Sequence, residues 1–222
     1  MRAVHYFLLL GAVLFSCAMD AAAQTQVAVE RNRGTGATPQ FKFKKVPLPV
    51  DNDAARNAKF TVVDGAVDGN SGNLSVTHDG KLPDGEDQPK RNFFFEGERG
   101  GRLSIDLGKA VEIKQVNTYS WHPTTRGAQV YKLYAADGTE DGFEAGPKKG
   151  TDPAACGWKL IAAVDTRGEE DDGGQYGVSI SDAAGTVGKY RYLLFDIAST
   201  ENDDPFGNTF FSRMNVIAAG RD

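Results

Sequence analysis

The sequence predicts an all-β protein: a jelly-roll β-sandwich, mainly antiparallel and with little helix. Three observations predict it. Apolar and polar residues alternate over many short segments, glycine-rich breaks separate these segments, and no segment keeps a 3.6-residue period for ten residues with capping residues at its ends. Many short strands joined by turns are typical of sandwiches and jelly rolls.

The strands are expected in the following order. Residues 41–44 alternate and open the domain as an edge strand that ends before Pro47 and Pro49. Residues 64–92, rich in Asp, Gly, Asn and Pro, form a long loop region with short strands at most. The remaining strands carry alternating apolar residues: Leu103, Ile105 and Leu107; Val111 and Ile113; Tyr131, Leu133 and Ala135; Trp158, Leu160, Ala162 and Val164; Tyr176, Val178 and Ile180; Leu193, Phe195 and Ile197; Phe210, Met214 and Val216.

The chain divides into three parts. Residues 1–23 have the pattern of an export signal: a basic start at Arg2, an apolar run over residues 7–15 and small residues before Gln24. The run is too short for a transmembrane helix, which needs roughly 20 apolar residues. Residues 24–40 are expected to be a flexible polar lead-in, and residues 41–222 to form the domain. In an alternative interpretation, residues 14–17 are a lipoprotein box and Cys17 is lipidated.

Charge and cysteine content restrict the class of protein. The net charge of −5 argues against nucleic acid and anionic membranes as partners. Cys156 is the one cysteine outside the predicted signal, so no internal disulfide is expected, and a small buried thiol is the favoured interpretation. The predicted compartment is secreted, periplasmic or cell-envelope.

The most informative local sequence is the polar aromatic segment after the second strand of the Gly100 to Gly138 region. It gathers Tyr119, Trp121, His122 and Arg126 within eight residues. An aromatic face and a few directed polar groups are what sugar recognition requires, because the ring covers C–H groups and the polar atoms bind hydroxyls. These four residues are the predicted ligand-binding residues. The structural alternative is that Trp121 closes the end of the sandwich and Arg126 pairs with an acidic loop.

Catalytic motifs are not apparent. His5, His78 and His122 are the three histidines, and none sits in a nucleophile or zinc motif. Acidic residues cluster at 169–172 and 201–204, where a hydrolase with paired carboxylates or a cation site could draw its ligands, but their spacing fixes no such geometry. They are interpreted as solvated loops, and the protein is expected not to be an enzyme.

Four sequence features, in order along residues 41–219, resemble those of the discoidin-like domains, also called coagulation factor five/eight type C, of the galactose-binding-like superfamily. They are an early Asp-Gly element at Asp79-Gly80 (or at Asp64-Gly65) with the aromatic strand Phe93-Phe94-Phe95; Ile105-Asp106-Leu107-Gly108; residues 131–138 followed by Trp158; and Thr209-Phe210-Phe211 with Met214-Asn215-Val216. At least one phenylalanine of the 93–95 run must face away from its neighbours, since successive strand side chains alternate.

The resemblance implies an eight-stranded jelly roll whose loops at one end bind glycans, lipid head groups or proteins. It also implies a structural calcium near the Asp-Gly loop and a glutamate of the last strand. Asp79 is the candidate metal ligand, but Arg213 stands at the glutamate position, and an arginine repels calcium. Calcium therefore requires a substitute ligand among Asp84, Glu86 and Asp87.

The functional hypothesis is a secreted, non-catalytic module that recognises carbohydrate at the cell envelope or in extracellular polymer. The main alternative is a structural, adhesion or protein-interaction module without a small ligand. A hydrolase that uses the acidic loops is a third.

Overall fold

The computed structural model describes residues 25–48, 52–168, 173–201 and 207–220. In these ranges it contains no α-helix, and six short 3₁₀ helices lie in the connections. The strands are β1 (Thr25–Asn32), β2 (Lys59–Asp64), β3 (Gly101–His122), β4 (Val130–Ala136), β5 (Lys159–Asp165), β6 (Gly174–Asp182), β7 (Gly188–Ile197) and β8 (Phe211–Ala218). All strand pairs are antiparallel, which confirms the predicted fold class.

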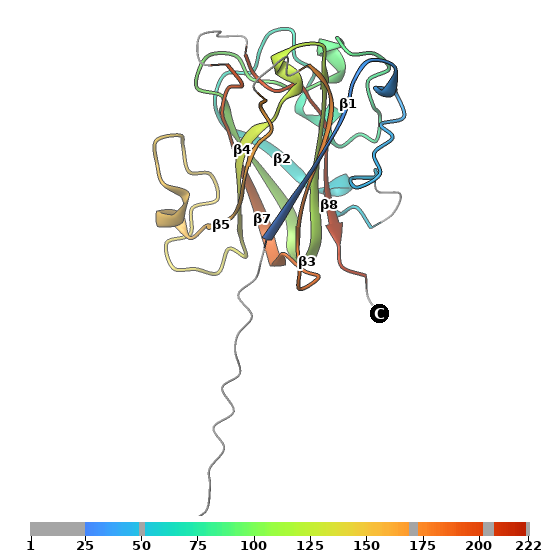
Figure 1. Ribbon diagram of the computed structural model, residues 1–222. Coiled ribbons are helices and arrows are strands. Elements are labelled where there is room, and N and C mark those ends of the chain that lie inside the picture. The colour runs from blue at the N-terminus through green and yellow to red at the C-terminus, as the bar shows by residue number, and fades with distance from the viewer. Residues whose placement is uncertain (1–24, 49–51, 169–172, 202–206, 221–222) are drawn as a thin grey trace, which may run out of the picture.

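The long strand β3 joins the two layers of the sandwich (Figure 1). Its first half pairs with β2 and β7, and β4 and β5 extend that layer beyond β7. Its second half lies between β6 and β8 in the other layer, where β1 is the edge strand. The predicted turn at Gly108 is a bulged corner, because the β3–β7 register shifts between Asp106 and Val111 and Gly108 has a φ of 77°.

The core fills the space between the two layers. Inward-facing residues of β3, β4, β6, β7 and β8 make one cluster that includes Leu103, Leu133, Val178, Phe195 and Met214, each at most 1 % exposed. A second cluster lies on the outer face under the loop between β4 and β5 and contains Trp158, Tyr134 and Cys156. The predicted alternation therefore holds for β3, β4, β6 and β7. It is wrong in part for β5, where Leu160 is 49 % exposed and Trp158 lies in another cluster than Ala162 and Val164.

The N-terminal part of the domain differs from the expectation. Residues 25–32 of the predicted flexible lead-in form β1, which pairs with β6 from Thr25 opposite Asp182 to Asn32 opposite Gln175. Conversely, residues 41–44 form no strand: Phe41 has a φ of 48°, and its ring is buried against Tyr119 and Trp121. Residues 1–23, the predicted export signal, lie outside the described residues.

We expect β1 to contribute to stability. Glu30 of β1 accepts backbone hydrogen bonds from Lys44 and Val46, each at 3.0 Å, and so holds the segment that covers the second layer. Deleting residues 1–32 removes these bonds and uncovers the edge of β6. The expected loss in the free energy of unfolding is on the order of 3 kcal/mol or more, measured by urea denaturation. A chain lacking only residues 1–23 is the control, and equal stability of the two would show that β1 is dispensable.

Candidate functional site

A pocket of about 520 Å³ lies at the end of the sandwich where β3 finishes. We call it the loop-end pocket. The connection between β2 and β3, the end of β3 with the turn after it, and the segment before β8 contribute to it. It is lined by Asp68, Asn70, Asp87, Pro89, Lys90, Phe94, His122, Arg126 and Phe210. Figure 1 shows the loops gathered at the upper end of the sandwich and β8 running to the opposite end.

The floor of the pocket is aromatic. The rings of Phe94 and Phe210 stack with centroids 3.9 Å apart at an interplanar angle of 17°. The ring of His122 meets Phe210 edge-on at 4.5 Å, and the Arg126 guanidinium lies 5.5 Å from the same ring. Phe93 and Phe95 face the core, so Phe94 faces the other way, as the alternation of the 93–95 run predicts. Two rigid rings thus fix the positions of the two polar side chains above them.

His122 is a neutral hydrogen-bond donor toward the pocket. Burial, with a smaller contribution from the charge of Arg126, lowers its pKa to about 4, so the imidazole is uncharged near neutral pH. Its Nδ1 accepts a hydrogen bond from the Thr124 backbone N–H at 3.1 Å. The remaining hydrogen is therefore on Nε2, which lies 3.9 Å from Asp87 Oδ1. This separation is too long for a direct hydrogen bond and leaves the Nε2–H donor available to a ligand.

The pKa of His122 makes stability depend on pH. Its folded pKa is depressed below the ordinary 6.5, so its contribution is fully present above pH 6.5 and is lost as the pH falls toward 4. The free energy of unfolding of the wild type should fall when the pH is lowered from 6.5 to 4. In His122→Gln we expect this fall to be smaller by on the order of 2–3 kcal/mol. Urea denaturation at a series of pH values tests this. Burial also lowers the pKa of His78, so the free energy of unfolding should still depend on pH in both proteins. Identical slopes would contradict the assignment.

The charges around the pocket balance. Asp68 and Asp87 supply two carboxylates, and Lys90 and Arg126 supply two cations. Asp68 is 8 % exposed, and its Oδ1 accepts the Asn70 backbone N–H at 2.7 Å; the Lys90 ammonium donates to the Gly69 carbonyl at 3.1 Å. The side chain of Asp87, in contrast, is 64 % exposed. The hollow therefore offers both donors and acceptors without net formal charge, which suits a neutral ligand with several hydroxyl groups.

Two of the four predicted binding residues lie elsewhere. The segment is the end of β3 and not a loop, so its side chains alternate between the two faces of the strand. Tyr119 and Trp121, 0 % and 4 % exposed, are buried against Phe41 on the outer face of the second layer. These two rings therefore do not line the loop-end pocket, whereas His122 and Arg126 both do.

The metal prediction rested on Asp79. Its Oδ1 accepts the Lys81 backbone N–H at 2.7 Å, and the described residues contain no group of three or more carboxylate, histidine or cysteine side chains placed to hold a metal ion. Residues 169–172 and 202–204 of the acidic clusters lie outside the described part of the chain. Glu201 accepts a hydrogen bond from the Thr125 hydroxyl.

Sequence reasoning missed most of the pocket lining. From the sequence alone, Asp68 and Asn70 fall in a loop region, Asp87 is a candidate only as a substitute calcium ligand, and Phe94 and Phe210 fall in predicted strands. The mixture of Asp, Asn and Gly at residues 68–70 marked a tight turn, which was the available signal. Nothing in their spacing links these residues to His122, because the fold brings together the β2–β3 connection, the end of β3 and the segment before β8.

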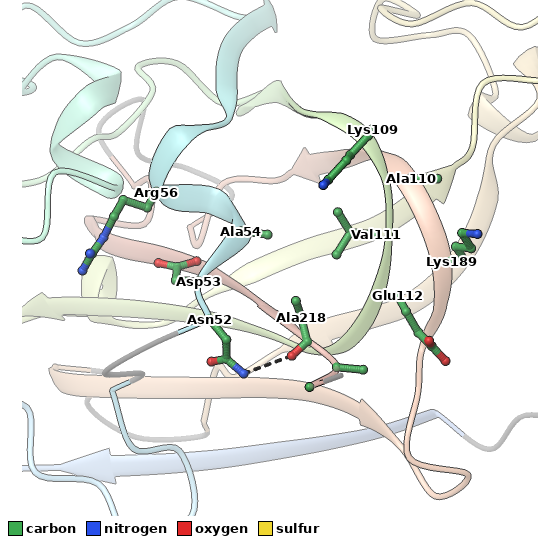
Figure 2. Close-up of a pocket in the computed structure, with 12 residues that line it drawn as sticks. Asn52, Asp53, Ala54, Arg56, Lys109, Ala110, Val111, Glu112, Lys189 and Ala218 are labelled. Atoms are coloured by element: carbon green, nitrogen blue, oxygen red, sulfur yellow. Dashed lines mark hydrogen bonds between the residues drawn. The ribbon is translucent and has the colours of Figure 1, made fainter. Parts of the chain in front are cut away.

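A larger hollow of about 740 Å³ lies at the opposite end, beside the corner of β3 (Figure 2). Lys109, Glu112 and Lys189 are among the residues that line it, and their side chains are exposed. Figure 2 shows the hydrogen bond that the Asn52 side-chain amide donates to the Ala218 carbonyl at 3.0 Å. No aromatic ring lines this hollow, so the loop-end pocket is the better candidate for sugar recognition.

No family model and no curated protein sequence matches the chain. Among solved structures, the lectin domain of lectinolysin, in complex with Lewis B antigen, is similar over 78 % of this chain and 100 % of that chain, with a TM-score of 0.50 and 12 % identity. The chain has the discoidin-like, galactose-binding-like fold. This likeness confirms the resemblance found in the sequence at the level of the fold.

Two further structures are similar at TM-scores below 0.5. The module CBM32-1 from a family 31 glycoside hydrolase of Clostridium perfringens has a TM-score of 0.48 and 12 % identity, over 77 % of this chain and 99 % of that chain. The fucose-binding module SpX-3 of Streptococcus pneumoniae has a TM-score of 0.45 and 11 % identity, over 76 % and 98 %. Within the described residues, no helix has the length and apolar character needed to cross a membrane.

Proposed function

We propose that this domain is a non-catalytic module that binds a neutral carbohydrate in the loop-end pocket. The observation that carries the proposal is the neutral His122, with its Nε2–H directed at a charge-balanced hollow above two stacked rings. A sugar hydroxyl can accept a hydrogen bond from Nε2 and donate one to Asp87, because it can do both at once. The fold likeness supports the proposal, since that lectin domain is in complex with Lewis B antigen.

Arg126 supplies the second directed donor. Its guanidinium is held against Phe210, and a planar fork of N–H groups suits two adjacent sugar oxygens. Uncharged glycans are favoured over uronates or sialosides, because Asp68 and Asp87 offset the two cations. Action at the cell envelope or in extracellular polymer is part of the proposal and rests on the export signal read in residues 1–23.

Glycan-array and affinity-gel binding test this function. We expect His122→Ala and Arg126→Ala each to weaken binding about 10-fold or more, as loss of a directed hydrogen bond to a ligand does. Trp121→Phe is the control, because Trp121 lies in the buried aromatic cluster on the outer face of the second layer and does not line the pocket. Binding of both pocket variants at the wild-type level, with the proteins folded, would refute the site. Absence of any bound glycan would refute the function.

A further inference from the structure

Arg213 of β8 is a cation in an unusual place. It is 8 % exposed and pairs across the sheet with Tyr119 of β3. Met214 and Val216 face the core, so Arg213 and Asn215 face the outer side of this layer. The buried aromatic cluster that contains Phe41, Phe43 and Tyr119 lies on that same side.

The guanidinium of Arg213 lacks a partner among the described residues. Its Nε is fully buried without a hydrogen bond, and neither Nη forms a hydrogen bond or an ion pair with the described part of the chain. Arg102 of β3, which is 3 % exposed, also has a buried Nε without a hydrogen bond, but both of its Nη atoms have partners. One of its Nη atoms donates to the carbonyls of Pro147, Lys148 and Thr151, and the other pairs with Asp196 at 2.9 Å.

The carboxylate that contacts β8 is already occupied. Asp53 Oδ1 accepts the backbone N–H groups of Ala55 and Val216 at 3.1 and 3.0 Å, and Oδ2 accepts the Asn215 amide at 2.5 Å. Trp121 Nε1 is a second buried donor without a partner on the same face of β3. Asn215 Oδ1 is a buried acceptor without a partner on this side. Among the described residues, the donors of Arg213 and Trp121 outnumber this one acceptor, and burying polar groups without partners is costly.

We propose that Arg213 is the centre of an oxyanion-binding site on the outer face of the second layer. The ligand is a sulfate, phosphate or carboxylate group, whose oxygen atoms match the planar fork of the guanidinium. The site is separate from the loop-end pocket and does not depend on the proposed carbohydrate binding. It binds an anion at the position where the sequence resemblance implied a ligand for a cation.

Thermal unfolding in 0–10 mM sodium sulfate at fixed ionic strength tests the site. We expect the wild-type midpoint to rise saturably by roughly 2–8 °C, because a ligand that binds only the folded state stabilises it. Arg213→Met should show no saturable rise. Arg56→Met, which removes an exposed arginine outside the site, should respond like the wild type. Equal responses of the wild type and Arg213→Met, or no wild-type response, would overturn the proposal.

A second measurement covers the case in which Arg213→Met does not fold. Wild-type crystals soaked in sodium selenate should show an anomalous selenium peak within hydrogen-bonding distance of the Arg213 guanidinium. Selenium peaks only elsewhere, or water alone at Arg213, would overturn the site. Phosphate and acetate in the same unfolding assay distinguish which oxyanion is preferred.

Discussion

Replacing Arg102 by methionine is expected to lower the free energy of unfolding by about 3–5 kcal/mol, measured by urea denaturation. The guanidinium donates to three carbonyls of the β4–β5 loop and to the Asp196 carboxylate. Its loss therefore leaves the three carbonyls without this donor and removes one of two cationic partners of a partly buried carboxylate. Lys149 still contacts Asp196 at 3.1 Å but reaches none of these carbonyls. The aromatic cluster around Trp158 should loosen together with the loop.

Arg191→Met is the matched control. Arg191 pairs with Asp106 at 2.8 Å, and its side chain is 39 % exposed. Exposed ion pairs typically contribute about 0–1 kcal/mol, so this variant should remain close to wild type. If both substitutions lower the free energy of unfolding by the same amount, burial does not explain the contribution of Arg102 to stability.

The second large effect is expected for Phe210→Ala. Phe210 is 1 % exposed and contacts Phe94, His122 and Arg126, so the substitution both opens a cavity and removes the support of two ligand-binding side chains. We expect a loss of about 3–5 kcal/mol in the free energy of unfolding and a loss of glycan affinity greater than that of either single pocket variant. Urea denaturation and titration calorimetry with an array-selected glycan measure the two effects.

Phe143→Ala separates stability from binding. Phe143 packs against Trp158 and Tyr192 in the cluster under the β4–β5 loop and does not line the loop-end pocket. It should cost stability but leave glycan affinity unchanged. Retention of full affinity by Phe210→Ala would show that the aromatic floor does not position His122 and Arg126.

The sequence predicted the central strands well, because their buried faces impose a period of two. It failed for β1, an edge strand whose Val27 and Val29 are each 41 % exposed and whose signal is only a few residues long. It also failed at residues 41–44, where Phe41 and Phe43 alternate with lysines but lie in an irregular segment that covers the second layer. Segments distant in the chain decide both cases: β1 pairs with β6, and Phe41 and Phe43 pack against the end of β3.

The candidate site was half predictable. His122 and Arg126 could be identified from residue type and proximity. Tyr119 and Trp121 could not be excluded without knowing that β3 continues to His122, which sends alternate side chains to opposite faces. Asp68, Asp87 and Phe210 join the pocket only through the fold, and no local pattern marks them as neighbours of His122.

A crystal structure of the protein with an array-selected neutral glycan tests the central claim most directly. We expect the sugar in the loop-end pocket, with one hydroxyl within hydrogen-bonding distance of both His122 Nε2 and Asp87, and with Arg126 contacting a neighbouring oxygen. A sugar bound instead in the hollow beside Lys109 and Lys189, with the loop-end pocket empty, would contradict the proposed site.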